Sequence, residues 1–373
     1  MDALADEATS TRRDFEARVA DLENAAREIA RALAEPPPRH QALIEDAIRA
    51  VQRHIMQIAP QFQIIETRLA ALTREVSSQR PPGRLPQAWY DLGTRIGHVR
   101  VAVNQWPRIE PLVRAQIAEP REKLITQVRP GTGAAARAEL ADAAFDHLHQ
   151  ILNPLEQDAG AVSLGAYADI GLPQSQFIAF CHAARRVALA QGWEETRFLD
   201  VGCGMGLKLI AAAQFFDAVA GLELDAGYAG RARDFVTAAN LPKSQVVEVD
   251  GREFPHYATF NVIYLFRPVE DAAAMDSLEA KIIEALDPGS LIIAPYRGLR
   301  ARHRKHGLWP LADGLYTAGL TRSQSRALRR RAEYIGPSTR PPVQALQNVW
   351  TPILDASHGN GFDMKRDGRL DHV

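Results

Sequence analysis

Three glycines at alternate positions follow a short apolar run near the middle of the chain. The stretch FLDVGCGMG spans residues 198–206 and places Gly202, Gly204 and Gly206 behind the acid Asp200. Glycine adopts positive φ and, lacking a Cβ, lets another group approach the backbone closely. Such a loop serves a tight structural turn, a dinucleotide site or a site for another nucleotide-like cofactor.

The spacing of the glycines separates these alternatives. A dinucleotide fingerprint is G-x-G-x-x-G, with a pyrophosphate at the N-terminus of the next helix. Here the pattern is G-x-G-x-G, and Leu207 stands where the fingerprint needs glycine or alanine. A nicotinamide cofactor is therefore disfavoured. Asp200, two residues before the first glycine, suits a cationic ligand or one with an ammonium group.

The elements that must position this loop are those of an α/β sheet. After a helical pattern at 175–192, which ends at a glycine, short apolar runs alternate with helical stretches; the runs are 197–201, 218–224, 245–249, 260–266 and 290–295. This alternation is typical of βαβ units and a parallel sheet covered on both faces. Residues 308–319 are expected to add an antiparallel pair that turns at Asp313-Gly314. Ligands bind beyond the carboxyl ends of such strands, where the glycine loop lies.

Four motifs in order make this region similar to the class I S-adenosylmethionine-dependent methyltransferases. They are FLDVGCGMG (198–206), GLELD (221–225), VVEVDGREF (246–254) and ALDPGSLIIAPY (285–296), in which Ser290 replaces a glycine that many members carry. The resemblance, over about residues 174–320, implies a doubly wound, mostly parallel seven-stranded sheet. It also implies S-adenosylmethionine as cofactor and methyl transfer as the activity.

The resemblance also assigns roles to individual residues. Glu223 would accept from both ribose hydroxyls, which suits an acceptor-only carboxylate, and Asp250 would accept from the adenine amino group. The cofactor-binding residues implied are Asp200, Gly202, Gly204, Gly206, Glu223 and Asp250.

The methyl acceptor is less well marked. The fourth apolar run lacks the N-P-P-[FY] type of motif that holds an amine acceptor, and Arg267-Pro268 follows it instead. Arg267 is a candidate to hold an anionic or carbonyl group of the substrate, with a structural ion pair as the alternative. Tyr296 is a candidate to line the acceptor pocket. No pattern selects a catalytic base, and no Cys/His spacing predicts a metal site.

The rest of the chain divides into four predicted regions. Residues 1–80 form a helical hairpin or coiled coil with apolar residues at heptad spacing, in which Pro60 should kink or split the second helix. Residues 87–160 form a helical linker or cap, 161–320 the methyltransferase domain and 321–373 an Arg- and Pro-rich extension. The heptads over residues 12–78 are expected to pair with a second copy or a partner helix, or to fold back within the chain.

Composition excludes several classes of protein. The net charge is −1, so the whole chain has no bias towards polyanions. No apolar run reaches the roughly 20 residues that cross a bilayer, and the acidic N-terminus is unlike a secretory signal; we expect a cytoplasmic protein. Between residues 297 and 340 there are eleven Arg or Lys and two acidic residues. Nucleic acid is a possible partner of this segment, but a solvated helix face is favoured.

Two functional hypotheses follow from these patterns. The first is an enzyme, an S-adenosylmethionine-dependent methyltransferase whose acceptor is unidentified, with a protein or other large molecule slightly preferred by analogy. The second is a scaffold in which the coiled coil carries the function and the methyltransferase fold binds its cofactor without catalysis.

Overall fold

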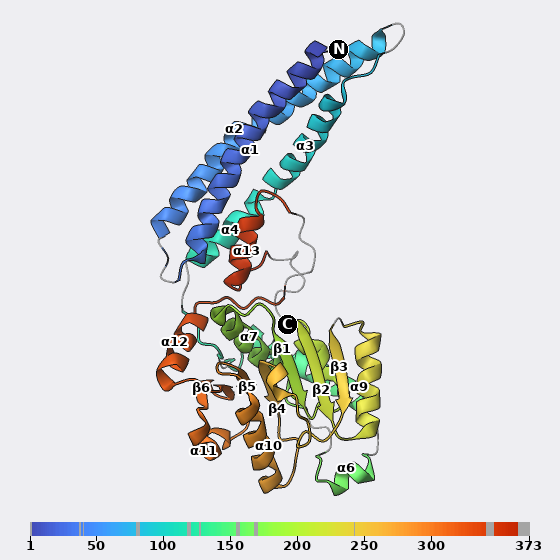
Figure 1. The fold of residues 1–373 in the computed structure, drawn as a ribbon, viewed down its shortest axis with the longest axis vertical. Coiled ribbons are helices and arrows are strands. Elements are labelled where there is room, and N and C mark those ends of the chain that lie inside the picture. The colour runs from blue at the N-terminus through green and yellow to red at the C-terminus, as the bar shows by residue number, and fades with distance from the viewer. Residues whose placement is uncertain are drawn as a thin grey trace. The chain divides into compact units, whose positions relative to one another are not determined.

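The computed structural model describes residues 2–36, 39, 41–79, 83–117, 121–126, 128–153, 157–167, 171–241, 243–340 and 347–364. The chain forms two compact units (Figure 1). The helical unit combines the N-terminal helices with residues from the C-terminal part, and the sheet unit lies between them in the sequence, at 121–340. Among the described residues, no helix combines the length and apolarity needed to cross a membrane.

The first two helices of the helical unit pair as an antiparallel hairpin. Helix α1 (Asp2–Ala34) lies along α2 (Gln41–Ser78) (Figure 1). Arg68, late in α2, donates to Glu7, early in α1, at 2.7 Å. Their apolar stripes face each other and are buried together with α3 (Gln87–Val103), α4 (Trp106–Ile117) and α13 (Thr351–Gly359). The predicted heptads therefore pair within the chain. The apolar residues that a partner helix would need under the scaffold hypothesis are already buried.

Two prolines mark features of the helical unit that the sequence analysis singled out or bounded. Pro60 does not split the second helix, because α2 runs through it as one element. Pro60 and the preceding Met56 are both exposed, so the carbonyl that loses its amide partner faces solvent. Helix α3 lies at the start of the predicted helical region at 87–160, and Pro86 is its N-cap.

The sheet unit contains seven strands in the order β3-β2-β1-β4-β5-β7-β6. The first five are parallel, while β7 runs antiparallel to β5 and β6 antiparallel to β7. The predicted pair at 308–319 thus closes the sheet. The strands are β1 (Arg197–Val201), β2 (Ala218–Glu223), β3 (Ser244–Glu248), β4 (Val262–Leu265), β5 (Leu291–Ile293), β6 (Trp309–Ala312) and β7 (Leu315–Thr317).

Helices cover both faces of this sheet. Alternate residues of β1 point to opposite sides: Phe198 packs in the core with α7 (Gln174–Gln191), and Leu199 in the core with α10 (Ala272–Ala285). Helix α7 ends as predicted, because Gly192 at φ 70° allows the closing bonds to the carbonyls of the last turn. The remaining helices are α5 (Gly133–Leu152), α6 (Ala159–Ser163), α8 (Leu207–Ala212), α9 (Ala226–Ala238), α11 (Leu299–Arg302) and α12 (Arg322–Ala332).

The boundaries of the two units differ from the four predicted regions. The predicted linker at 87–160 is divided, because α3 and α4 bury their apolar faces in the helical unit, whereas α5 packs on α7 in the sheet unit. The predicted extension at 321–373 is divided as well, with α12 in one unit and α13 in the other. Residues 341–346 and 365–373 of that extension lie outside the described residues.

A truncation inside the hairpin tests the pairing within the chain. Leu22 is fully buried, and Leu43 is 57% exposed. Leu22→Ala should lower the free energy of unfolding by about 2–5 kcal/mol, the usual cost of a cavity in a core. Leu43→Ala is the matched control and should change it by less than about 0.5 kcal/mol. Urea unfolding followed by circular dichroism measures both, and equal small effects would contradict the intrachain packing.

Candidate functional site

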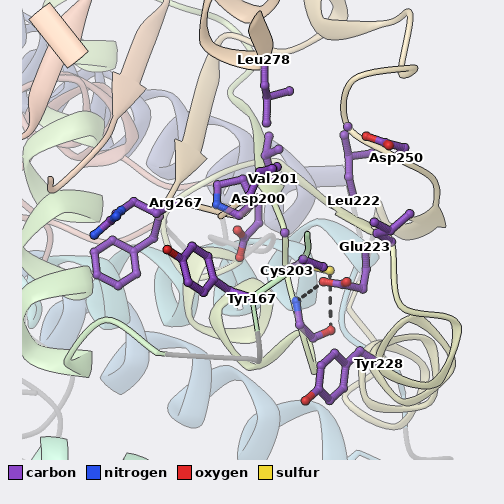
Figure 2. A pocket seen from close by; sticks show the side chains of 18 of the residues that line it. Tyr167, Asp200, Val201, Cys203, Leu222, Glu223, Tyr228, Asp250, Arg267 and Leu278 are labelled. Atoms are coloured by element: carbon purple, nitrogen blue, oxygen red, sulfur yellow. Dashed lines mark hydrogen bonds between the residues drawn. The ribbon is translucent and has the colours of Figure 1, made fainter. Parts of the chain in front are cut away.

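A cavity of about 280 Å³ opens at the carboxyl ends of the central strands. It lies where the strand order reverses, between β1 and β4, which is the expected ligand site of an open α/β sheet. Its walls come from the loops after β1, β2, β3 and β4, from α8, and from residues 164–167 and 171–172. Figure 2 shows Asp200 between two groups, with Glu223 and Asp250 on one side and Arg267 and Tyr167 on the other.

The three glycines of the first loop do different work. Gly202, at φ 81°, touches the loop after β4 so closely that an added Cβ would lie 2.7 Å from Cβ of Pro268. Gly204 lines the cavity. Gly206 lies outside the cavity lining, and an added Cβ there would meet Ala232 of α9 at 2.9 Å. Gly202 and Gly206 thus allow neighbouring elements to approach the loop. Gly202 and Gly204 form part of the cavity wall.

Glu223 ties the ends of β1 and β2 together. Its side chain is buried, and its two oxygens accept from the backbone amides of Gly204, at 2.7 Å, and Asp225, at 2.9 Å. Each carboxylate oxygen has two lone pairs, so both oxygens keep capacity for a ligand's hydroxyl donors. Glu223 lines the cavity, and a vicinal diol fits this arrangement.

Asp200 and Lys208 place charged groups deep in the cavity wall. Asp200, at the end of β1, is 2% exposed and lines the cavity. Lys208, on α8, is also buried and donates to the carbonyl of Leu172 at 2.6 Å. Its ammonium lies 3.9 Å from the centre of the Phe145 ring. Sequence reasoning missed Lys208, because nothing in the spacing of the loop distinguishes it from a solvated lysine.

Asp250 lies at the far end of the same wall, next to an arginine that the sequence reasoning also missed. Arg252 pairs with it at 2.5 Å, and the backbone amide of Arg252 donates to it at 2.8 Å. The side-chain hydrogen bonds from Arg252 lower the pKa of Asp250 below its ordinary value. Asp250 is therefore an ionised acceptor at neutral pH.

A short segment before α7 forms part of the wall opposite the strands. Residue Ala166 forms an antiparallel bridge with Val269, after β4. The amide of Asp158 donates to the carboxylate of Asp225, after β2, at 2.6 Å. These bonds fix residues 157–167 to two of the strand-end loops, so Leu164 and Tyr167 line the cavity.

Arg267 lies in this wall in an unusual backbone conformation. Its φ is 53°, one of three positive values among the described non-glycine residues, a conformation that persists only where surrounding contacts enforce it. Pro268 against Gly202 and the bridge at Val269 supply those contacts. The guanidinium lies 5.9 Å from the centre of the Tyr167 ring, and Arg267 lines the cavity.

Tyr296 does not join the residues that line the cavity. Its hydroxyl donates to Glu279 at 2.9 Å, and burial raises the pKa of Tyr296 well above its ordinary value. Glu279 also bonds Arg302 and His303. Asp276, Glu279 and His303 have metal-ligand atoms close together, but Arg302 already pairs with both carboxylates. Tyr296 therefore belongs to a charged cluster that holds the segment after β5 on α10.

Part of the positive charge of the basic segment at 297–340 is balanced by acidic partners. Arg300 and Arg304 lie in the segment after β5, whereas Arg326 and Arg330 lie on α12, and Figure 1 shows α11 and α12 on the same side of the sheet, beside β6. Arg329 and Arg302 are neutralised by Glu333 and Glu279. This pairing favours a solvated charged surface over a nucleic-acid groove.

A family model and a curated relative match this part of the chain. The model described as protein-L-isoaspartate(D-aspartate) O-methyltransferase matches residues 159–305. A protein-L-isoaspartate O-methyltransferase from Rhodopseudomonas palustris is 27% identical over 189 residues, which cover 48% of this chain and 80% of the relative.

These matches, together with the seven-stranded sheet, show a class I S-adenosylmethionine-dependent methyltransferase domain in this chain. The chain is therefore an enzyme whose cofactor is S-adenosylmethionine and whose reaction requires a methyl acceptor.

Parts of this chain also match solved structures of other methyltransferases. An amino pentose methyltransferase from Micromonospora echinaspora, with S-adenosylmethionine bound, is 25% identical; the match covers 35% of this chain and 58% of that one, with a TM-score of 0.26. An RNA methyltransferase from Salinibacter ruber, in complex with S-adenosylhomocysteine, is 19% identical over 40% of this chain and 91% of that one, with a TM-score of 0.28. The assignment of the methyltransferase rests on the family model and the curated relative.

A single added methyl group tests the close approach at Gly202. Gly202→Ala should push the loop after β4 away and weaken binding of S-adenosylhomocysteine by tenfold or more, because the Cβ would overlap Pro268 and strain φ. Gly230→Ala, in α9 with open space around its Cβ position, is the matched control and should bind normally. Calorimetric titration measures both, and unchanged affinity in Gly202→Ala would contradict the contact.

Proposed function

We propose that this methyltransferase transfers the methyl group to a carboxylate oxygen of a polypeptide acceptor, forming a methyl ester. Arg267 is the observation that carries the proposal. It is the arginine of the cavity wall opposite Glu223 and Asp250 (Figure 2), and a guanidinium matches a carboxylate in charge and in bidentate geometry. The family model and the curated relative are both described as protein-L-isoaspartate O-methyltransferases, which supports the same acceptor class.

The cofactor is proposed to lie along the other wall. Glu223 would accept from the ribose hydroxyls, and Asp250 from the adenine amino group. Asp200, buried at the end of β1, would face the ammonium group of the methionine part. Gly202 and Gly204 let the chain pass close to the ligand, while Gly206 contributes by packing α8 on α9. Because the sulfonium joins the ribose to the methionine chain, the reactive methyl group would belong to the part of the ligand between Glu223 and Asp200.

The chemistry of a carboxylate acceptor fits the groups in the cavity. S-Adenosylmethionine supplies an electrophilic methyl group on a sulfonium. A carboxylate oxygen forms the new C–O bond with its own lone pair, the C–S bond breaks, and its electron pair stays on sulfur. No proton moves, so no general base is needed. Arg267 would orient the acceptor, and Tyr167 would hold the guanidinium in place.

Substitutions at Arg267 test the acceptor site. Arg267→Gly accommodates the positive φ and removes the guanidinium. Arg267→Lys keeps the positive charge but loses the bidentate geometry of the guanidinium. Arg267→Gly should raise the KM for an isoaspartyl peptide by about 10- to 100-fold, the effect of a lost hydrogen bond to a charged group. Affinity for S-adenosylhomocysteine should not change. Arg330→Gln on α12 is the control, and transfer of a radiolabelled methyl group is the measurement.

The result for Arg267→Lys separates two roles. If Arg267 only stabilises the loop, Arg267→Gly should relieve strain and leave KM near the wild-type value. If the guanidinium holds the acceptor, Arg267→Lys should fall between the wild type and Arg267→Gly. An unchanged KM in all three proteins would reject the acceptor role.

The pH dependence of the rate tests the chemistry independently. A free acceptor carboxyl has a pKa of about 4, so its reactive form is complete at neutral pH. The rate of methyl transfer should be flat between pH 6 and 8 and should fall as the acceptor is protonated, near pH 4. An amine or hydroxyl acceptor would instead give a rate that rises through the neutral range. Single-turnover rates at saturating cofactor distinguish the two profiles.

A further inference from the structure

The exposed large apolar side chains of the sheet unit are concentrated in one stretch. Among the described residues of this unit they are Val128, Leu140, Leu148, Ile151, Val162 and Leu164, exposed by 45–78%. All of them precede α7 and the first strand. Scattered exposed apolar residues are ordinary, but a concentration of them marks a surface that binds something.

Helix α5 is apolar on two opposite faces. One face, with Phe145 and Leu152, packs against the buried cluster around Leu207 and Tyr228. The opposite face is exposed and carries no charged residue over four turns; it consists of Ala136, Leu140, Ala143, Ala144, His147 and Ile151. A surface helix normally places polar residues on its outer side, and a helix that is apolar all round is normally covered.

The last turn of α5, which carries Ile151, lies near the cavity, because Tyr228, which lines the cavity, belongs to the same cluster as Leu152. The last turn of α5 and the start of α6 are fixed at the same place, because Leu152 packs near Tyr228 of α9 and the amide of Asp158 donates to Asp225, the N-cap of α9. Leu164, just after α6, is 51% exposed and also lines the cavity. We call Leu140, Leu148, Ile151, Val162 and Leu164 the α5–α6 surface.

We infer that the α5–α6 surface binds the polypeptide on one side of the methylated carboxylate, through apolar side chains of the acceptor. The inference rests on the proposed function and adds a preference for acceptors with apolar residues beside the acidic one. Two observations select this occupant. Leu164 belongs both to the surface and to the cavity, and Tyr167, three residues further, lies beside Arg267. A chain whose carboxylate reaches Arg267 therefore leaves the cavity along Leu164.

Three acceptors and two matched variants test the inference. The acceptors are a blocked isoaspartyl tripeptide, a twelve-residue isoaspartyl peptide with Leu and Val flanks, and the same peptide with Ser and Gly flanks. Leu140→Gln combined with Ile151→Gln removes the two most exposed side chains of the surface without adding charge. Met56→Gln combined with Ile64→Gln, on α2, removes residues that are 75% and 58% exposed and is the control.

The α5 variant should raise the KM for the Leu/Val peptide about tenfold. Its KM for the tripeptide, its kcat and its affinity for S-adenosylhomocysteine should be unchanged, and the control variant should behave as wild type. Equal KM values for both long peptides with the wild-type enzyme would overturn the inference. The inference would also be overturned if the α5 variant had normal KM values but a different molecular mass by light scattering. The surface would then join two copies of the chain.

Binding of a fluorescein-labelled Leu/Val peptide, measured by anisotropy at saturating S-adenosylhomocysteine, separates this inference from the proposed function. Methylation of neither peptide, together with binding that the α5 variant weakens tenfold, would reject the carboxylate chemistry and keep the docking surface. Methylation of all three acceptors, with peptide binding that the α5 variant leaves unchanged, would keep the carboxylate chemistry and reject the docking surface.

Discussion

The buried carboxylate of Glu223 holds the functional end of the sheet together. It accepts from the amide of Gly204, which follows β1, and from the amide of Asp225, which follows β2. Asp225 in turn caps α9 and accepts from Asp158, which starts the segment over the cavity. Two linked carboxyl groups, those of Glu223 and Asp225, thus fix the loop of the cofactor site, the next helix and the opposite wall relative to each other. Leaving these amides unpaired in a buried site costs about 1–3 kcal/mol each.

The wall opposite Glu223 depends on a steric constraint instead. Gly202 leaves no room for a side chain between itself and Pro268, and this contact, with the bridge at Val269, keeps Arg267 at positive φ. The cofactor loop and the acceptor side are therefore coupled through van der Waals contact. Preorganisation of this kind is what a displacement reaction needs, since the protein contributes mainly orientation.

Much of this arrangement is readable in the sequence, for a physical reason. The alternation of apolar runs and helical patterns predicts the sheet, including the closing pair after residue 308, because burial imposes periods of 2 and 3.6 residues. The glycine spacing and the acids at 200, 223 and 250 point to the cavity because they occupy strand ends. Lys208 and Arg252 are not readable in this way, since their partners are a carbonyl and a carboxylate brought near by the fold. Tyr296 is misplaced for the same reason: its partner Glu279 lies 17 residues away on another element.

The division of the helical unit between the two ends of the chain has a consequence for biosynthesis. Trp350 is completely buried there, donates to the carbonyl of Ala102 at 2.6 Å and lies 5.0 Å from Trp106. The ribosome releases α1 to α4 first, but their core is incomplete until residue 350 has emerged, after the whole sheet unit. The usual case is an N-terminal unit that is complete before the next begins; here the whole sheet unit is synthesised before α13 can complete the core of the N-terminal helices.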